Sequence, residues 1–161
     1  MSILVFSDSH GNTNNIIKSI KKNKNFELVI HLGDFCRDMI IVKENFKDLK
    51  YEVVRGNNDW AREIPTEKII EVKGKKIFIT HGHQYGVKSD YQRIINKGKL
   101  LNVDAVLFGH THIAEEMFFD GMLVLNPGSI ALPSSGNKTY CVIDIKDNKF
   151  WTRFESVNSF I

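Results

Sequence analysis

The chain has 161 residues, of which 42% are apolar and 25% are charged, and its formal net charge at neutral pH is +3. A chain of this length can bury a hydrophobic core without needing disulfide bonds for stability. The composition is that of a soluble globular protein. The small net charge and the scattered lysines argue against nucleic acid as a stable partner. Cys36 and Cys141 lack metal-type spacing and are interpreted as free thiols of a reducing compartment. We expect one cytoplasmic domain over residues 1–161, because no stretch is typical of a signal peptide or membrane span.

The first half of the chain alternates strands with helices. Apolar runs predict strands at residues 3–6, 28–32 and 53–54. Apolar positions at helical spacing predict helices from 13 or 14 to about 24, with Thr13 or Asn14 as the cap, and from about 37 to 46. This βαβαβ order favours a parallel sheet whose strands end at one edge.

The second half is richer in hairpins. Strands are expected at residues 68–72, 76–80, 105–108, 115–119, 122–125, 140–145 and 149–154, with a helix from 89 or 90 to 101. Tight turns are expected at Lys73-Gly74-Lys75, Asp120-Gly121 and Asp147-Asn148. The pattern predicts an α/β protein in which two sheets pack face to face and helices cover each outer face.

Five of these strands end in a short polar segment. The segments are Ser7-Asp8-Ser9-His10, Gly33-Asp34, Gly56-Asn57-Asn58-Asp59, His81-Gly82-His83 and Gly109-His110-Thr111-His112. Each segment alone has an ordinary structural explanation, such as a turn or a helix cap. Five in one short chain predict a single shared site.

The residue types of this site favour divalent metals. Asp8 and His10 share a side of an extended chain, as do His110 and His112, because alternate residues point the same way. The Asp34 carboxylate can bridge two ions. With the Asn57 amide and the His81 imidazole, seven nitrogen and oxygen ligands without a thiolate suit Mn, Fe, Co, Ni or Zn in a catalytic site.

The same five motifs resemble the signature of calcineurin-like metallophosphoesterases. The short length and Asn126-Pro127-Gly128-Ser129 are similar to the small YfcE-type phosphodiesterases of bacteria and archaea. The resemblance implies a four-layer αββα sandwich of two mixed sheets flanked by helices. It also implies two divalent ions, with Mn²⁺ preferred over Ni²⁺, Fe, Co²⁺ or Zn²⁺, and a metal-bridging hydroxide as nucleophile. One ion would bind Asp8, His10, Asp34 and His112, and the other Asp34, Asn57, His81 and His110.

One position departs from the larger superfamily. Many members carry a histidine, thought to protonate the leaving group, where this chain has Asn58. An amide cannot donate a proton in that way, so the substitution favours phosphate diesters, with Asp59 orienting its neighbours and His83 as an alternative acid. Five further residues receive supporting roles. Asn12, Arg55 and Ser129 are candidate phosphate or supporting contacts, His31 is expected to be buried behind the site, and Asp38 is expected to be a solvated helix charge.

The leading hypothesis is therefore a metal-dependent phosphodiesterase acting on a small phosphate ester. A phosphomonoesterase or pyrophosphatase using the same site stays open. So does a non-catalytic binding scaffold, because a retromer subunit of this fold has a degraded metal site. A homo-oligomer is compatible with the sequence.

Overall fold

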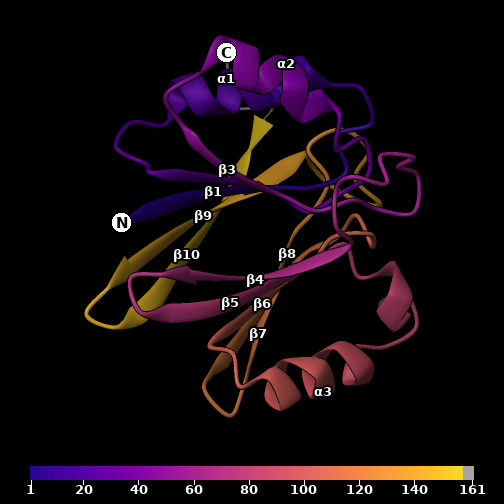
Figure 1. The fold of residues 1–161 in the computed structure, drawn as a ribbon, viewed down its shortest axis with the longest axis vertical. Coiled ribbons are helices and arrows are strands. Elements are labelled where there is room, and N and C mark those ends of the chain that lie inside the picture. Colours follow the sequence, from indigo (N-terminus) through magenta and orange to yellow (C-terminus); the bar gives the residue numbers. More distant parts are fainter. Residues whose placement is uncertain (158–161) are drawn as a thin grey trace.

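The computed structural model describes residues 1–157, so residues 158–161 of the expected domain lie outside the described part. The chain forms four layers, with α1 and α2 above one sheet and α3 below the other (Figure 1). The first sheet has the strand order β10-β9-β1-β2-β3. Its strands are β1 (Ser2–Phe6), β2 (Leu28–His31), β3 (Lys50–Val53), β9 (Thr139–Lys146) and β10 (Lys149–Ser156). β1, β2 and β3 run parallel, as the βαβαβ pattern predicts.

The second sheet has the strand order β4-β5-β6-β8-β7. Its strands are β4 (Glu67–Val72), β5 (Lys75–Thr80), β6 (Ala105–Leu107), β7 (Ala114–Phe119) and β8 (Met122–Pro127). β5, β6 and β8 are parallel to one another, whereas β4 and β7 join as antiparallel hairpin partners at the two edges. Both sheets are therefore mixed, and the predicted αββα architecture is confirmed.

Three apolar clusters hold the layers together. The central one lies between the sheets and includes Ile3, Ile30, Ile79 and Leu107. A second joins the first sheet to α1 (Thr13–Lys22) and α2 (Asp38–Asn45), and a third joins the second sheet to α3 (Gln92–Leu101). The buried strands read as continuous apolar runs because both of their faces are covered.

Local signals place most turns correctly. Lys73-Gly74, Asp120-Gly121 and Asp147-Asn148 all have positive φ at both residues, as two-residue hairpin turns with right-handed twist require. The expected cap of α1 was wrong by one or two residues. Asn12 is the N-cap, and its side-chain oxygen accepts a hydrogen bond from the Asn15 backbone N–H.

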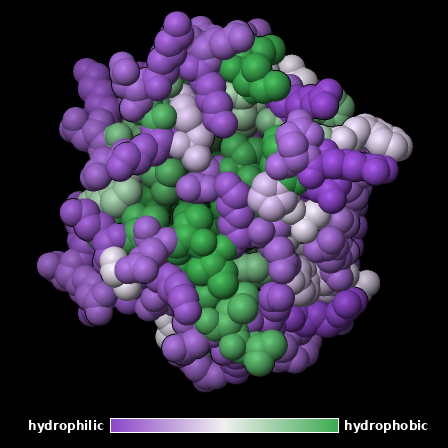
Figure 2. Space-filling view, in the orientation of Figure 1, coloured by the Kyte–Doolittle hydropathy of each residue, from purple (hydrophilic) through white to green (hydrophobic). Residues whose placement is uncertain are grey.

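The face toward the viewer in Figure 1 carries a band of apolar surface bordered by hydrophilic side chains (Figure 2). A cavity of about 470 Å³ lies between strands of the two sheets, lined by Met1, Leu28, Ile69, Ile70 and Val72 among others. Its residues come from the beginnings of β1, β2 and β3 and from β4 and the turn that follows it, away from the polar segments at the ends of β1 and β2. No helix within residues 1–157 is long and apolar enough to span a membrane.

Candidate metal centre

The polar segments converge at one end of the sandwich. Asp8 and Asp34 follow β1 and β2 of the first sheet, while His81 and His110 follow β5 and β6 of the second. Because parallel strands end at a common edge, each sheet presents its own segments there. The two edges face each other across the central core, so the sheets supply opposite walls of one site.

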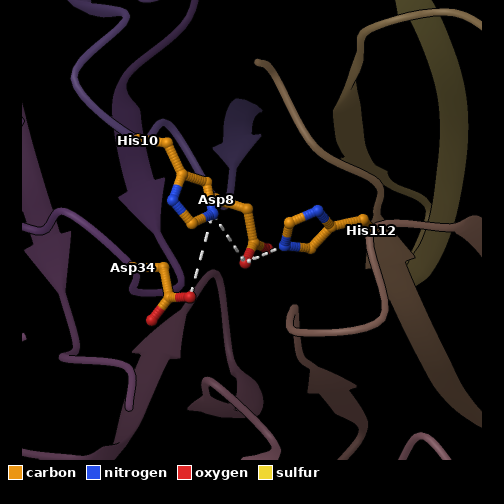
Figure 3. Close-up of side chains that lie close together, drawn as sticks. All are labelled: Asp8, His10, Asp34 and His112. Carbon is orange, nitrogen blue, oxygen red and sulfur yellow. Dashed lines mark ion pairs between the residues drawn. The ribbon is translucent and has the colours of Figure 1, made fainter. Parts of the chain in front are cut away.

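Four of the seven expected ligands form a tight cluster. The ligand atoms of Asp8, His10, Asp34 and His112 all lie within 4.8 Å of one another. Figure 3 shows the two carboxylates and His10 approaching from the amino-terminal half of the chain, with His112 opposite. His112 Nε2 lies 3.0 Å from Asp8 Oδ1, and His10 Nε2 lies 4.0 Å from Asp8 Oδ1 and 3.8 Å from Asp34 Oδ2.

His81 and His110 adjoin this cluster. His81 Nε2 lies 3.4 Å from Asp34 Oδ1, and His110 Nδ1 lies 3.2 Å from His81 Nε2. Both carboxylates therefore face the two groups of imidazoles: Asp34 lies nearer to His81, and Asp8 Oδ1 lies 3.9 Å from the same His81 Nε2. Burial, with the neighbouring His81 and Lys88, lowers the pKa of His110 to about 4.

The orientation of two imidazoles is that of metal ligands. His81 Nδ1 lies 2.8 Å from the Leu32 carbonyl, and His112 Nδ1 bonds the Leu132 carbonyl. A carbonyl only accepts, so each Nδ1 carries the proton and each Nε2 presents a lone pair to the carboxylates. This backbone-held tautomer is what metal-binding histidines adopt.

The protein's own groups leave some polar atoms of the cluster without partners. Among the described residues, Asp8 Oδ1 and His10 Nε2 are buried and make no hydrogen bond. Burial alone would raise the pKa of Asp8. Contact with His112, the charge of His81 and the Ser7 hydroxyl together outweigh burial, so the pKa of Asp8 is lowered and the group is ionised at neutral pH. The close contact with the Asp8 carboxylate raises the pKa of His112. A buried carboxylate surrounded by imidazole lone pairs is an environment that suits a cation. Because all the donor atoms are nitrogen or oxygen, a divalent cation fits best.

The backbone at these residues is strained. Asp8, His10, Asp34, His110 and His112 all have φ between 44° and 70°, in the left-handed region. This conformation is uncommon for residues other than glycine, although Asp and His tolerate it better than most. Strain concentrated at one cluster indicates a functional site rather than a packing requirement.

The segment after β3 contributes in a different way from the one expected. Asn57 is exposed and makes no hydrogen bond to the cluster within residues 1–157. Asn58 holds Asp34, because its backbone N–H and its side-chain amide donate to the two carboxylate oxygens at 3.0 and 2.6 Å. Asp59 accepts from the backbone N–H groups of Cys36 and Gly56, so it ties two loops together.

His83 lies beside the cluster but outside it. Its ring centre is 5.5 Å from that of His81 and 6.1 Å from that of His110. Its Nδ1 is buried without a hydrogen-bond partner in the described part of the chain. Burial and the neighbouring His81 lower the pKa of His83.

A network of buried hydrogen bonds lies beneath the site, and the sequence predicts only part of it. His31 is fully buried, as expected, and its Nδ1 accepts from the Gly33 N–H, so Nε2–H donates to Ser9 Oγ at 3.0 Å. Ser9 Oγ in turn donates to Asp38 Oδ2 at 2.6 Å, and the Gly11 N–H donates to the same oxygen at 2.9 Å. The expectation that Asp38 is a solvated charge is wrong, since it is only 9% exposed. The helical pattern placed Asp38 in the first turn but could not show that the preceding loop folds over it.

Two of the other three supporting residues, Asn12 and Ser129, are structural. Asn12 caps α1. Ser129 is fully buried, and its hydroxyl donates to the Asp8 carbonyl, so it supports the loop rather than facing substrate. Arg55 has a buried Nε without a hydrogen-bond partner among residues 1–157. Sequence reasoning gave no role to Asn126, whose amide donates to the Gly109 carbonyl at 2.8 Å and thereby fixes the His110 loop.

Comparison with known proteins agrees with this geometry. The model of the calcineurin-like phosphoesterase superfamily domain matches residues 1–148. The probable metallophosphoesterase YsnB of Bacillus subtilis is 31% identical over 156 residues, covering 96% of this chain and 90% of that protein. A phosphodiesterase of Methanocaldococcus jannaschii is 34% identical over 170 residues, covering 93% of this chain and 96% of that protein.

Solved structures give the same result. A Streptococcus pneumoniae protein described as a predicted phosphoesterase has a TM-score of 0.85 and 27% identity, covering 98% of this chain and 90% of that one. Vps29 of Entamoeba histolytica has a TM-score of 0.73 and 20% identity, covering 98% of this chain and all of that one, which shows a shared fold alone. The chain belongs to the calcineurin-like phosphoesterase superfamily. It is accordingly a phosphoric ester hydrolase with a candidate centre for divalent metal ions.

Proposed function

We propose that the protein is a phosphodiesterase that holds two divalent ions, with Mn²⁺ preferred, and hydrolyses a small phosphate diester. The observation that carries the proposal is the Asp8, His10, Asp34 and His112 cluster, with His81 beside Asp34 and His110 beside His81. The first group would hold one ion. Asp34, His81, His110 and Asn57 would hold the other, with the exposed Asn57 side chain turning inward.

Bound ions would supply positive charge for the phosphate oxygens and lower the pKa of a coordinated water. The chain's own residues prepare the site for them. Asn58 clamps both oxygens of Asp34, and the backbone carbonyls of Leu32 and Leu132 fix the rings of His81 and His112. Such fixed groups hold charge where the reaction needs it without reorganising at the moment of reaction.

Diester preference follows from Asn58. Its amide donates to Asp34 and has no proton to give to a leaving group. A stable aryl oxide needs little protonation, whereas a basic alkoxide benefits from an acid by about 10²–10⁴-fold. We therefore expect turnover of bis(p-nitrophenyl) phosphate and much slower turnover of glycerol phosphate.

One observation favours a phosphomonoesterase as the second candidate. His83 has a buried nitrogen without a partner in the described part of the chain and lies beside His81, so it is placed to approach a leaving group. Steady-state kinetics of the wild type, Asn58→His and His83→Ala on both substrates separate the two. Diester preference in the wild type, with a higher monoester rate in Asn58→His, supports the proposal. Monoester preference that His83→Ala abolishes would make His83 the acid.

The two-ion arrangement has its own test. After chelation and reconstitution with Mn²⁺, elemental analysis should give two ions per chain, and activity should depend on their return. Asp34→Asn keeps the shape but removes the charge that both ions would share, so we expect loss of at least one ion and of nearly all hydrolysis. Two retained ions with a wild-type rate in Asp34→Asn would contradict the bridging assignment.

A further inference from the structure

A second recess adjoins the metal centre on the α3 side. It is a cavity of about 330 Å³ that shares His110 and His112 with the centre and is otherwise lined by Val87, Lys88, Tyr91, Thr111, Ile113 and Ser134. A substrate phosphate held at the cluster would therefore direct one of its organic substituents into this cavity. The volume lies at the lower end of small-ligand pockets, which run from about 300 to 1,000 Å³. It suits one compact group, not a polymer.

The walls of this cavity are held in place, and Val87, Tyr91 and Ile113 form their apolar part. The Tyr91 ring packs against Phe108 with their centres 5.3 Å apart, and its hydroxyl donates to Glu115, so the ring cannot swing away. Val87 is buried, whereas Ile113 is 44% exposed at the mouth of the cavity. The opposite side is held by Ser134, whose N–H donates to the His112 carbonyl and whose hydroxyl donates to the Thr111 carbonyl.

Lys88 gives the cavity its charge. It is exposed, and within residues 1–157 it has no carboxylate partner. Among residues 1–157, no Asp or Glu lines the cavity, and the nearby Glu115 accepts a hydrogen bond from the Tyr91 hydroxyl. An unpaired lysine beside the apolar side chains of Val87, Tyr91 and Ile113 complements a group that has an apolar body and a negative charge.

We propose that this cavity binds the organic substituent of the phosphate ester, and that Lys88 selects a compact apolar group, of about one aromatic ring, that carries an anionic substituent. This inference rests on the proposed function, which places the phosphate of the substrate at the metal cluster. It adds the chemical class of the substrate, and it makes Lys88 a specificity-determining residue outside the metal centre.

The test uses two matched diesters, methyl 4-carboxyphenyl phosphate and methyl 4-carbamoylphenyl phosphate, with the Mn²⁺-loaded enzyme. They differ in the charge of the aryl substituent, and the ratio of their kcat/KM values is compared among variants, so that intrinsic reactivity cancels. We expect the ratio to fall about two- to fivefold in Lys88→Ala, the range of an exposed ion pair, and further in Lys88→Glu. Lys18→Ala, an exposed lysine on α1, is the control and should leave the ratio unchanged. A ratio that is the same in all four proteins would overturn the proposal.

A binding measurement separates this proposal from the diesterase assignment. The monomethyl esters of 4-carboxybenzylphosphonate and 4-carbamoylbenzylphosphonate carry a carbon in place of the bridging oxygen, and calorimetry gives their Kd values. A preference for the carboxylate that Lys88→Ala abolishes supports the cavity even if neither diester is hydrolysed, in which case only the diesterase assignment fails. Ile113→Ser should weaken both ligands equally, because it changes the apolar wall and not the charge. No preference in the wild type would refute the role of Lys88.

Discussion

Replacing Asp38 should destabilise the protein strongly even though it lies outside the metal cluster. Asp38 Oδ2 accepts two hydrogen bonds, from the Ser9 hydroxyl at 2.6 Å and from the Gly11 N–H at 2.9 Å. Hydrogen bonds to a charged acceptor contribute about 1.5–3 kcal/mol each, and Asp38→Ala removes both. We expect a loss of about 3 kcal/mol in the free energy of unfolding, which corresponds to a fall in Tm of roughly 6–12 °C for a chain of this size.

Asp38→Asn sharpens the test. Both bonds go to one carboxylate oxygen, so an amide oxygen in that position can accept both, without the contribution of the negative charge. We therefore expect a loss of only about 1 kcal/mol, while Asp48→Ala, at an exposed turn, should stay within about 0.5 kcal/mol of the wild type. Equilibrium unfolding in urea with a chelator present measures all three. An Asp38→Ala variant that unfolds at the wild-type midpoint would refute the network.

Three further predictions concern the metal centre itself. A Cβ at Gly56 would lie 2.2 Å from Asp34 Oδ1, so Gly56→Ala should displace that carboxylate and weaken Mn²⁺ binding in calorimetry; unchanged affinity would contradict the crowding. At His10, where φ is 44°, the metal-free Gly variant should be about 1 kcal/mol more stable than the Ala variant, and equal midpoints in urea would argue against strain. In metal-free protein the pKa of His110 lies at about 4, below its unfolded value, so the stability it contributes is present above pH 6.5 and lost as the pH falls toward 4. An NMR titration of His110 with a pKa near 6.5 would show that reasoning to be wrong.

The sequence predicts the layers of the fold because each layer leaves a periodic signal. Apolar runs mark the strands that are covered by the other sheet on one face and by helices on the opposite face. Two-residue turns such as Asp120-Gly121 mark the hairpins. Convergence of the polar segments could also be predicted, because parallel strands end at one edge. Four residues of the cluster, from Asp8 to His112, come from three such ends.

Roles that depend on tertiary contacts could not be predicted in this way. Asp38 has the sequence context of an exposed helix start, and its burial depends on the loop from Ser9 to Gly11 folding over it. From the sequence, Asn58 is notable only because an amide cannot act as a general acid. The structure shows that Asn58 donates two hydrogen bonds to Asp34. Lys88 carries no signal in the sequence, since its significance lies in a cavity shared with His110 and His112.

The strain in the site explains why so many polar residues are buried beneath it. Five residues of the candidate metal centre adopt the left-handed conformation, and at about 1 kcal/mol each the total is about the lower end of the stability of a typical domain. The surrounding structure must offset this cost. Hydrogen bonds are directional and can hold a backbone peptide group in one orientation, whereas apolar packing is not directional. Ser129 holds the Asp8 carbonyl, Asn126 holds the Gly109 carbonyl, and the His31 network holds the loop before α1. These buried polar groups therefore serve the geometry of the site, because the strained loops they hold are the ones that carry its proposed ligands.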